Sequence, residues 1–279
     1  GPIKSNTANT SIYYHHGHLM AFVENTWPTR IDPRTLETLG PWNEADKWSH
    51  PVTAHPKMDP KTGEMLFFGY DMRNSPHRWY GKVNADGSMD TSSERPIPFQ
   101  GPPKMEHDFA ITENYALVLD LPLNFLGKNI MDGKNPWTFD LDSPAFITIF
   151  PRTKRDEKDI KLFPIKPCFV FHTAAAWEEG DVVVMIGCRY RDTDAFGLVT
   201  DRHVPLEAQR SDLYEWRCNM ATGEVVERLL YEPIFGVEFP IIHPNCVCVK
   251  PKYIWVGEFS DPGNGFFENM LKYNVETGE

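Results

Sequence analysis

The chain of 279 residues carries 39 acidic and 28 basic side chains, which gives a formal net charge of -11 at pH 7. Nucleic acids and anionic lipids both need a basic face, so this charge argues against either as the main partner. The abundant aromatic residues (18 Phe, 10 Tyr and 8 Trp) and the 24 prolines indicate short strands and turns rather than long helices.

Apolar runs alternate with tight turns from the N-terminal end of the chain onward. The run 65–70, for example, follows a turn that begins at Asp59 and contains Gly63. In such turns Asp or Asn caps the loop through its side chain, and glycine supplies the positive φ. Similar turns lie next to the apolar runs at 19–23, 80–83, 213–216 and 271–274. Each of these segments predicts a strand, a turn and often a further strand.

These repeated hairpins predict an all-β fold. Helical periodicity is scarce, and hairpins in a chain of this length can form a β-propeller, a pair of sandwiches or a large barrel. The recurrence of one turn type favours the propeller, in which each blade contains its own hairpins. We expect residues 1–279 to form a single partial β-propeller domain of roughly five blades, with loops capping one face. Residues 124–166, which are rich in Asn, Lys, Asp and Pro, are interpreted as an excursion between blades.

The cysteines and the apolar runs predict the cellular compartment. The five cysteines have no regular spacing, so we interpret them as buried thiols in a reducing compartment. Cys246 and Cys248 fall on alternate positions of an apolar run and would share one face of a strand, where a metal-binding role is the less favoured alternative. No run approaches about 18 apolar residues, and the N-terminus lacks the charged-then-apolar order of a signal peptide. The chain is therefore expected to be cytoplasmic.

Three of the ten histidines share one kind of local context. His55, His107 and His172 each stand at or near the start of an apolar strand, at intervals of 52 and 65 residues. The innermost strand of each propeller blade begins near the axis, so histidines at equivalent points of successive blades can converge on one metal ion. Spacing alone also allows three unrelated histidines that make core or turn hydrogen bonds.

Two glutamates are candidates for orienting such histidines. Glu24 ends the apolar strand 19–23, and Glu238 opens the apolar segment 239–242. Metal-bound imidazoles usually donate their second N–H to a carboxylate, which determines the tautomer and the ring orientation. A glutamate that faces solvent at a strand end is the common alternative.

Five motifs together resemble those of the carotenoid cleavage oxygenases. Segments 52–57, 106–115 and 171–178 resemble the first three iron-histidine motifs of that family in order and spacing. Segment 31–38 is similar to the turn upstream of the first of these histidines, and 238–240 is similar to the motif of an outer-shell glutamate. The matches extend over nearly the whole chain, so no single motif has to support the resemblance.

The resemblance implies both a fold and a set of site residues. Members of the family are seven-bladed propellers in which four histidines hold one Fe(2+) ion. His55, His107 and His172 would be three of these ligands, and Glu24 and Glu238 would orient them. The resemblance implies no catalytic residue beyond the metal ligands and no other cofactor site. The fourth histidine of the family lies beyond the last matching motif, so we expect this chain to be a fragment that lacks its N- and C-terminal parts.

The family's chemistry is the insertion of O2 across a conjugated C=C bond, which gives two carbonyl products. A small apolar conjugated molecule and O2 would be the substrates, and a peripheral membrane contact for substrate uptake is compatible with this. Stilbene-cleaving members carry a lysine immediately before the position of Glu24, where this chain has Val23. Without that ammonium a phenol substrate loses its charge-assisted hydrogen bond, which favours an apocarotenoid or related polyene over a stilbene.

Three alternatives stay open at this point. A stilbene-cleaving dioxygenase is the alternative within the family. A propeller that binds partners without chemistry would hold no iron. A zinc hydrolase could use three histidines and a water molecule as ligands, and its activity would not depend on O2. Activity of a truncated chain is not assumed.

Overall fold

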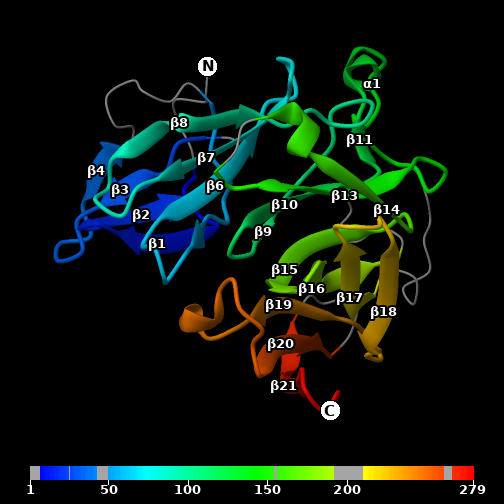
Figure 1. Cartoon of the computed structure of the whole chain (residues 1–279). Coiled ribbons are helices and arrows are strands. Elements are labelled where there is room, and N and C mark those ends of the chain that lie inside the picture. Colours follow the sequence, from blue (N-terminus) through cyan, green and yellow to red (C-terminus); the bar gives the residue numbers. More distant parts are fainter. Residues whose placement is uncertain (1–6, 25, 43–49, 154–155, 192–209, 261–265) are drawn as a thin grey trace. The chain divides into compact units, whose positions relative to one another are not determined.

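Within the described residues, the regular secondary structure is almost entirely β-strand (Figure 1). The structure, a computed structural model, describes residues 7–24, 26–42, 50–153, 156–191, 210–260 and 266–279. Within this part of the chain the helical elements are α1 (Gly127–Met131) and two 3-10 helices, Glu157–Asp159 and Pro244–Cys246. The chain divides into two compact units, Gly1–Gln100 and Gly101–Glu279. A single domain over residues 1–279 stays a prediction.

Within its described residues, the N-terminal unit contains two antiparallel four-stranded sheets, and the strands of each sheet follow one another in sequence order. The first sheet consists of β1 (Ser11–His15), β2 (His18–Phe22), β3 (Thr29–Ile31) and β4 (Thr38–Pro41). The second consists of β5 (Lys57–Met58), β6 (Met65–Tyr70), β7 (Arg78–Val83) and β8 (Met89–Pro96). All residues of β6 are buried, as expected of a strand whose sheet is covered on both faces.

The C-terminal unit contains three further antiparallel sheets and a two-stranded ribbon within the described residues. One sheet consists of β9 (Ala110–Ile111), β10 (Tyr115–Asp120), β13 (Ala145–Pro151) and β14 (Lys161–Ile165). The next consists of β15 (Phe169–Glu179), β16 (Val182–Tyr190), β17 (Ser211–Asn219) and β18 (Val225–Tyr231). The last consists of β19 (Val237–Ile241), β20 (Tyr253–Phe259) and β21 (Phe267–Asn274). The ribbon pairs β11 (Leu123–Phe125) with β12 (Trp137–Phe139).

The turns between these strands have the chemistry that the sequence predicts. Oδ1 of Asp59 accepts a hydrogen bond from the Lys61 amide at 2.8 Å, and the Gly63 amide donates to the Asp59 carbonyl oxygen at 2.8 Å. Gly63 has a φ of 73°, in the left-handed region that favours glycine. The same capped turn recurs at 219–223 and 274–278. The repeat in the sequence is therefore a repeat of blade-type hairpins.

Consecutive sheets within each unit share an apolar core. In the N-terminal unit, Phe22 of the first sheet and Phe67 of the second belong to one buried cluster. In the C-terminal unit, Ile147 and Trp216 belong to a cluster that joins the sheet of β13 to the sheet of β17. A further cluster joins the β15–β18 sheet to the last sheet. Antiparallel four-stranded meanders that stack face to face are the blades of a propeller, so the predicted fold class is confirmed.

The predicted excursion between blades over 124–166 is wrong, because this segment lies within one sheet: β10 and β13, which it connects, pair with each other. Residues 145–165 contain β13 and β14, two strands of one sheet, and β11, α1 and β12 occupy the connection that precedes them. β13 and β14 pair as a hairpin, and the 3-10 helix Glu157–Asp159 lies between them in the chain. Polar composition reports exposure to solvent, which a hairpin loop and a long excursion have in common.

The prediction for Cys246 and Cys248 is wrong in its geometry. Cys246 ends a 3-10 helix that begins at Pro244, and Cys248 has a φ of 71°, so the two residues do not alternate along a strand. The five cysteines are free thiols. Burial raises the pKa of Cys168 and of Cys218 to about 12, which keeps both thiols protonated at neutral pH.

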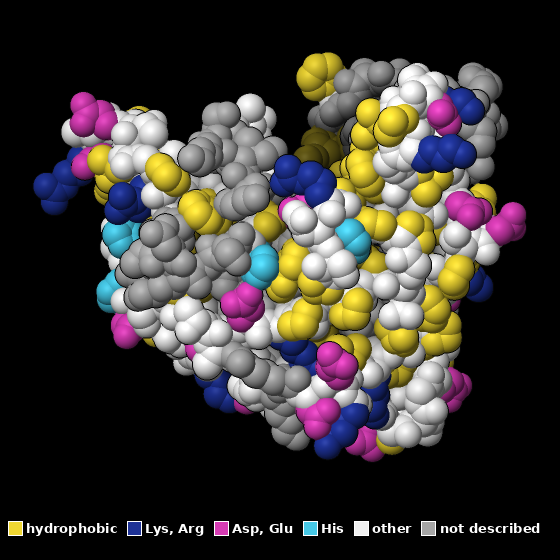
Figure 2. Space-filling view, turned by 90° about the horizontal axis from the view of Figure 1, so that it is seen from above, with side chains coloured by type: hydrophobic (Ala, Val, Ile, Leu, Met, Phe, Trp, Pro, Cys, Tyr) yellow, Lys and Arg dark blue, Asp and Glu magenta, His cyan; other side chains and the backbone are white. Residues whose placement is uncertain are grey.

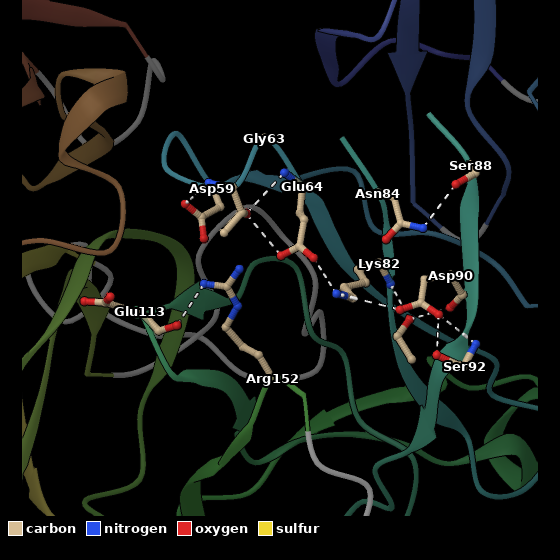
Figure 3. A network of polar contacts seen from close by, with 12 residues as sticks. Asp59, Gly63, Glu64, Lys82, Asn84, Ser88, Asp90, Ser92, Glu113 and Arg152 are labelled. Atoms are coloured by element: carbon tan, nitrogen blue, oxygen red, sulfur yellow. Dashed lines mark hydrogen bonds and ion pairs between the residues drawn. The ribbon is translucent and has the colours of Figure 1, made fainter. Parts of the chain in front are cut away.

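Charged side chains of both signs are organised in small networks and spread over the surface. In the N-terminal unit, Lys82 forms an ion pair with Glu64, and its Nζ atom lies 3.7 Å from Oδ2 of Asp90 (Figure 3). In the C-terminal unit, Arg152 donates to the Glu113 carbonyl oxygen at 3.2 Å. Acidic, basic and hydrophobic side chains are interspersed on the face that Figure 2 shows. Among the described residues, no helix has the length and apolar character needed to cross a membrane.

Candidate metal centre

His107 lies in the C-terminal unit between two buried carboxylates. Glu106 is 2% exposed and accepts a hydrogen bond from the Leu119 amide at 2.6 Å. Asp108 is also 2% exposed and accepts from the Phe109 amide at 2.8 Å. Because both neighbouring side chains are bonded to backbone groups, the segment that carries His107 into β9 is held in one conformation.

His172 lies at a β-bulge of β15. The register with β16 shifts between Val170 and Thr173, so that residues 171–172 oppose a single residue of β16. A bulge bends the strand and changes the direction of a side chain. A Cβ atom at Gly187 would lie 3.1 Å from the His172 carbonyl oxygen, so glycine permits the close approach of β16 to the bulge. The irregular ladder therefore determines where the His172 ring points.

The two histidines meet although they come from different sheets. The ring centroids of His107 and His172 are 4.9 Å apart, and the ring planes cross at 81°. Two imidazoles this close, and edge to face rather than stacked, can offer nitrogen ligands to one metal ion. The structure thus brings together the two predicted ligands of the C-terminal unit.

Glu238, the predicted orienting carboxylate, lies beside His172. Glu238 is on β19 and is 1% exposed, and its Oε2 atom lies 2.7 Å from Nδ1 of His172. The same oxygen accepts a hydrogen bond from the Phe239 amide at 2.8 Å. A carboxylate accepts, so the proton of the neutral His172 ring is on Nδ1 and the lone pair on Nε2 is the one available for coordination.

The surroundings of the two histidines are aromatic. The ring of Phe171 lies 5.6 Å from that of His107, and the ring of Phe239 lies 4.8 Å from that of His172, between centroids. Burial raises the pKa of Tyr190 well above its usual value, and the negative charge of Glu238 contributes to the shift. The surroundings of His172 therefore include apolar ring surfaces, a neutral phenol and the buried carboxylate of Glu238.

The donor set fits a first-row transition metal. Neutral imidazole is a ligand that suits iron, zinc, copper and nickel, and the pair of His172 with Glu238 has the tautomer that coordination needs. The residues present in the C-terminal unit are thus compatible with an Fe(2+) ion.

The other two predicted site residues lie in the N-terminal unit. His55 is half-buried, and its amide donates to Oγ1 of Thr53 at 3.1 Å, just before β5. Glu24 is half-buried after the end of β2, with the Tyr70 hydroxyl 3.4 Å from its Oε2 atom. The participation of His55 and Glu24 in a metal site stays a prediction.

Exchange of Glu238 for glutamine is expected to weaken metal binding by about 10–100-fold, the usual effect of removing an outer-shell partner. The neutral amide loses the charge-assisted hydrogen bond to His172 and can turn its NH2 group toward the ring. Competition with a chelating dye measures the affinity. Glu258→Gln is the matched control, because Glu258 on the neighbouring β20 bonds to the Tyr231 hydroxyl instead of a histidine. Equal losses in both variants would contradict a specific role of Glu238.

Comparison with known sequences gives a consistent set of relatives. The sequence model of the family described as retinal pigment epithelial membrane protein matches residues 2–279. The carotenoid 9,10(9',10')-cleavage dioxygenase 1 of Phaseolus vulgaris is 39% identical over 254 residues, which cover 89% of this chain and 46% of that protein. The isoeugenol monooxygenase of Pseudomonas putida is 30% identical over 268 residues, which cover 91% of this chain and 53% of that protein. The chain thus spans about half the length of these relatives.

Solved structures agree with the sequence relatives. The lignostilbene dioxygenase of Pseudomonas brassicacearum superposes with a TM-score of 0.86 at 28% identity, over 98% of this chain and 60% of that chain. The cobalt-substituted apocarotenoid oxygenase of Synechocystis superposes with a TM-score of 0.84 at 26% identity, over 98% of this chain and 59% of that chain.

Proposed function

The chain belongs to the family of retinal pigment epithelial membrane protein and the carotenoid cleavage oxygenases, and we propose from this that it acts as an Fe(2+)-dependent dioxygenase. The substrate is a small apolar molecule with a conjugated C=C bond, an apocarotenoid or related polyene. Both atoms of O2 enter the products, so that the double bond is replaced by two carbonyl groups. The observation that supports this most directly is the pair of His107 and His172 rings with Glu238 bonded to one of them.

We propose that His55 of the N-terminal unit is the third histidine ligand of the iron, with Glu24 as a further orienting carboxylate. Iron in this site supplies the one-electron chemistry that O2 needs in order to react with an alkene. The histidines would be neutral ligands, so none of them would offset the ion's positive charge. Glu238 would offset part of this charge through its hydrogen bond to His172, and it keeps the ring proton at Nδ1.

The aromatic side chains support an apolar substrate. Phe171 and Phe239 present ring surfaces beside the two histidines, and a conjugated polyene packs favourably against such surfaces. Val23, which precedes Glu24, offers no charged group to a phenol oxygen. These residues favour a polyene, and a 4-hydroxystilbene is the substrate for comparison. A cytoplasmic location and a peripheral membrane contact for substrate uptake are part of the same proposal.

Oxygen consumption by the Fe(2+)-loaded protein tests the proposal. With an apocarotenoid we expect one O2 consumed for each double bond cleaved, and with 18O2 we expect label in both carbonyl products. A parallel assay with a 4-hydroxystilbene ranks the two substrate classes. Ester hydrolysis by the zinc-loaded protein that does not depend on O2 would favour a hydrolase. Binding of polyenes without turnover in an iron-loaded protein would favour a binding module.

A further inference from the structure

A buried pair of side chains, Asp108 and Thr173, joins the backbone beside His107 to the backbone beside His172. Oδ2 of Asp108 accepts hydrogen bonds from the Thr173 amide and from the Thr173 hydroxyl, both at 2.9 Å. Oδ1 of Asp108 accepts from the Phe109 amide at 2.8 Å. Asp108 is 2% exposed and Thr173 is 6% exposed. One carboxylate thus connects residues that are 65 positions apart in the chain.

The Thr173 hydroxyl has two acceptors within reach. It lies 2.9 Å from Oδ2 of Asp108 and 2.9 Å from the carbonyl oxygen of Phe109. A hydroxyl has one proton and donates to one acceptor at a time, and a carboxylate is a stronger acceptor than a carbonyl group. Both acceptors belong to the segment that follows His107. Whichever one takes the proton, the hydroxyl bonds Thr173 to that segment.

This contact lies where β15 is least regular. The ladder between β15 and β16 shifts register on both sides of Thr173, between Val170 and Thr173 and again between Thr173 and Ala175. A bulge removes part of the ladder hydrogen bonding that would otherwise hold a strand in place. The Thr173 amide donates instead to Asp108, in the segment that leads into β9. The position of His172 is therefore determined by the neighbouring sheet as well as by its own.

We propose that Asp108 and Thr173 are positioning residues of the metal site, which hold the His172 ring at the separation from His107 that one metal ion requires. This inference rests on the proposed function. Neither side chain is a ligand here. Each acts through the histidine that it follows in the chain, and the pair sets the relative position of the two sheets at the point where both histidines leave the backbone.

A second contact between the same two sheets provides an internal comparison. Glu178, near the far end of β15, accepts hydrogen bonds from the Thr112 hydroxyl at 2.6 Å and from the Asn114 amide at 2.8 Å. The Asn114 side chain donates to the other oxygen of Glu178 at 2.9 Å. This carboxylate also joins the β9–β14 sheet to β15, but at a distance along the strand from His172. A substitution of Glu178 therefore distinguishes a general effect on sheet packing from an effect that is specific to the histidines.

The test compares Thr173→Val and Asp108→Asn with Thr173→Ser, which keeps the hydroxyl, and with Glu178→Gln. Cobalt(II) is the probe, because its absorption spectrum reports the geometry of its ligands. Competition with a chelating dye measures the cobalt affinity, and thermal unfolding without metal measures stability.

We expect Thr173→Val and Asp108→Asn to weaken cobalt binding by about 10-fold or more and to alter the spectrum. Thr173→Ser should behave like the unchanged protein. Glu178→Gln should lower the melting temperature but leave the cobalt affinity and spectrum unchanged.

Two results with cobalt would overturn the inference. One is cobalt affinity and spectrum in Thr173→Val equal to those of the unchanged protein. The other is a loss in Glu178→Gln as large as that in Thr173→Val, because the pair would then act through general packing. Histidine ring NMR signals in metal-free protein give a readout that does not need the metal. The His172 signal should shift in Thr173→Val and not in Glu178→Gln, and its failure to do so would also overturn the inference. If the unchanged protein binds no cobalt, the proposed metal site fails, and these NMR signals still decide whether Thr173 positions His172.

Discussion

Replacement of His172 by alanine is expected to abolish the retention of ferrous iron. The unchanged chain, loaded with Fe(2+) under anaerobic conditions and desalted, should retain about one ion, as one site of converging histidines would. Loss of an imidazole ligand should cost more than the roughly 10–100-fold that follows loss of an outer-shell partner. It also leaves the buried Glu238 without its partner at 2.7 Å. Metal analysis of the desalted protein measures the outcome.

His243→Ala is the matched control for this experiment. His243 is an exposed histidine of the same unit, and its ring nitrogen accepts a hydrogen bond from the Asn245 amide at 3.2 Å. The iron content of this variant should equal that of the unchanged chain. Iron retained by a folded His172→Ala variant would contradict the site, and so would equal loss in His243→Ala. His55→Ala in the same series tests whether the N-terminal unit contributes a ligand.

The second large effect concerns stability. Lys104→Met is expected to destabilise the C-terminal unit by about 3–5 kcal/mol, the usual cost of removing one partner of a buried ion pair. Lys104 forms an ion pair with Asp120, and the two side chains are 2% and 0% exposed. Without the ammonium, the Asp120 carboxylate stays buried at the end of β10 and loses this cation. Hydrogen exchange of the β10 amides, followed as a function of urea concentration, measures the change in the free energy of unfolding.

Two further variants make this prediction specific. Lys158→Met removes the partner of Asp156 from an exposed ion pair, with side chains 78% and 48% exposed, and should have little effect. The double variant Lys104→Met/Asp120→Leu replaces both charges by apolar groups and should recover much of the lost stability. A single Lys104→Met variant as stable as the unchanged chain would show that the pair contributes nothing, and a double variant less stable than the single one would point to another role for Asp120.

Errors in the sequence predictions have one origin. The segment 124–166 is predicted as an excursion between blades but lies within one sheet, because polar composition does not report which strands a connection joins. The strand expected at Cys246 and Cys248 is replaced by a 3-10 helix, because Pro244 cannot donate to a ladder and starts a helical turn. Both cases depend on local backbone geometry that hydrophobic patterning does not report.

Asp108 and Thr173 show what the sequence left unassigned. Both residues lie in the segments of the histidine motifs, yet neither carries a local signal of its role. A buried Asp with three donors and an exposed Asp in a turn have the same letter in the sequence. The contact becomes visible only when β15 and the segment before β9 are placed side by side.

The sequence by itself determined the features that depend on a few neighbouring residues. The turn of Asp59 and Gly63 is one, because capping and a positive φ act over five positions, and the alternation of apolar runs with such turns is another. The tertiary structure alone decided that Glu238 bonds to His172, 66 positions away, and that a bulge directs the ring. The reason is physical. Register and bulges across strands place side chains on one face or the other, and these depend on pairing between segments far apart in the chain.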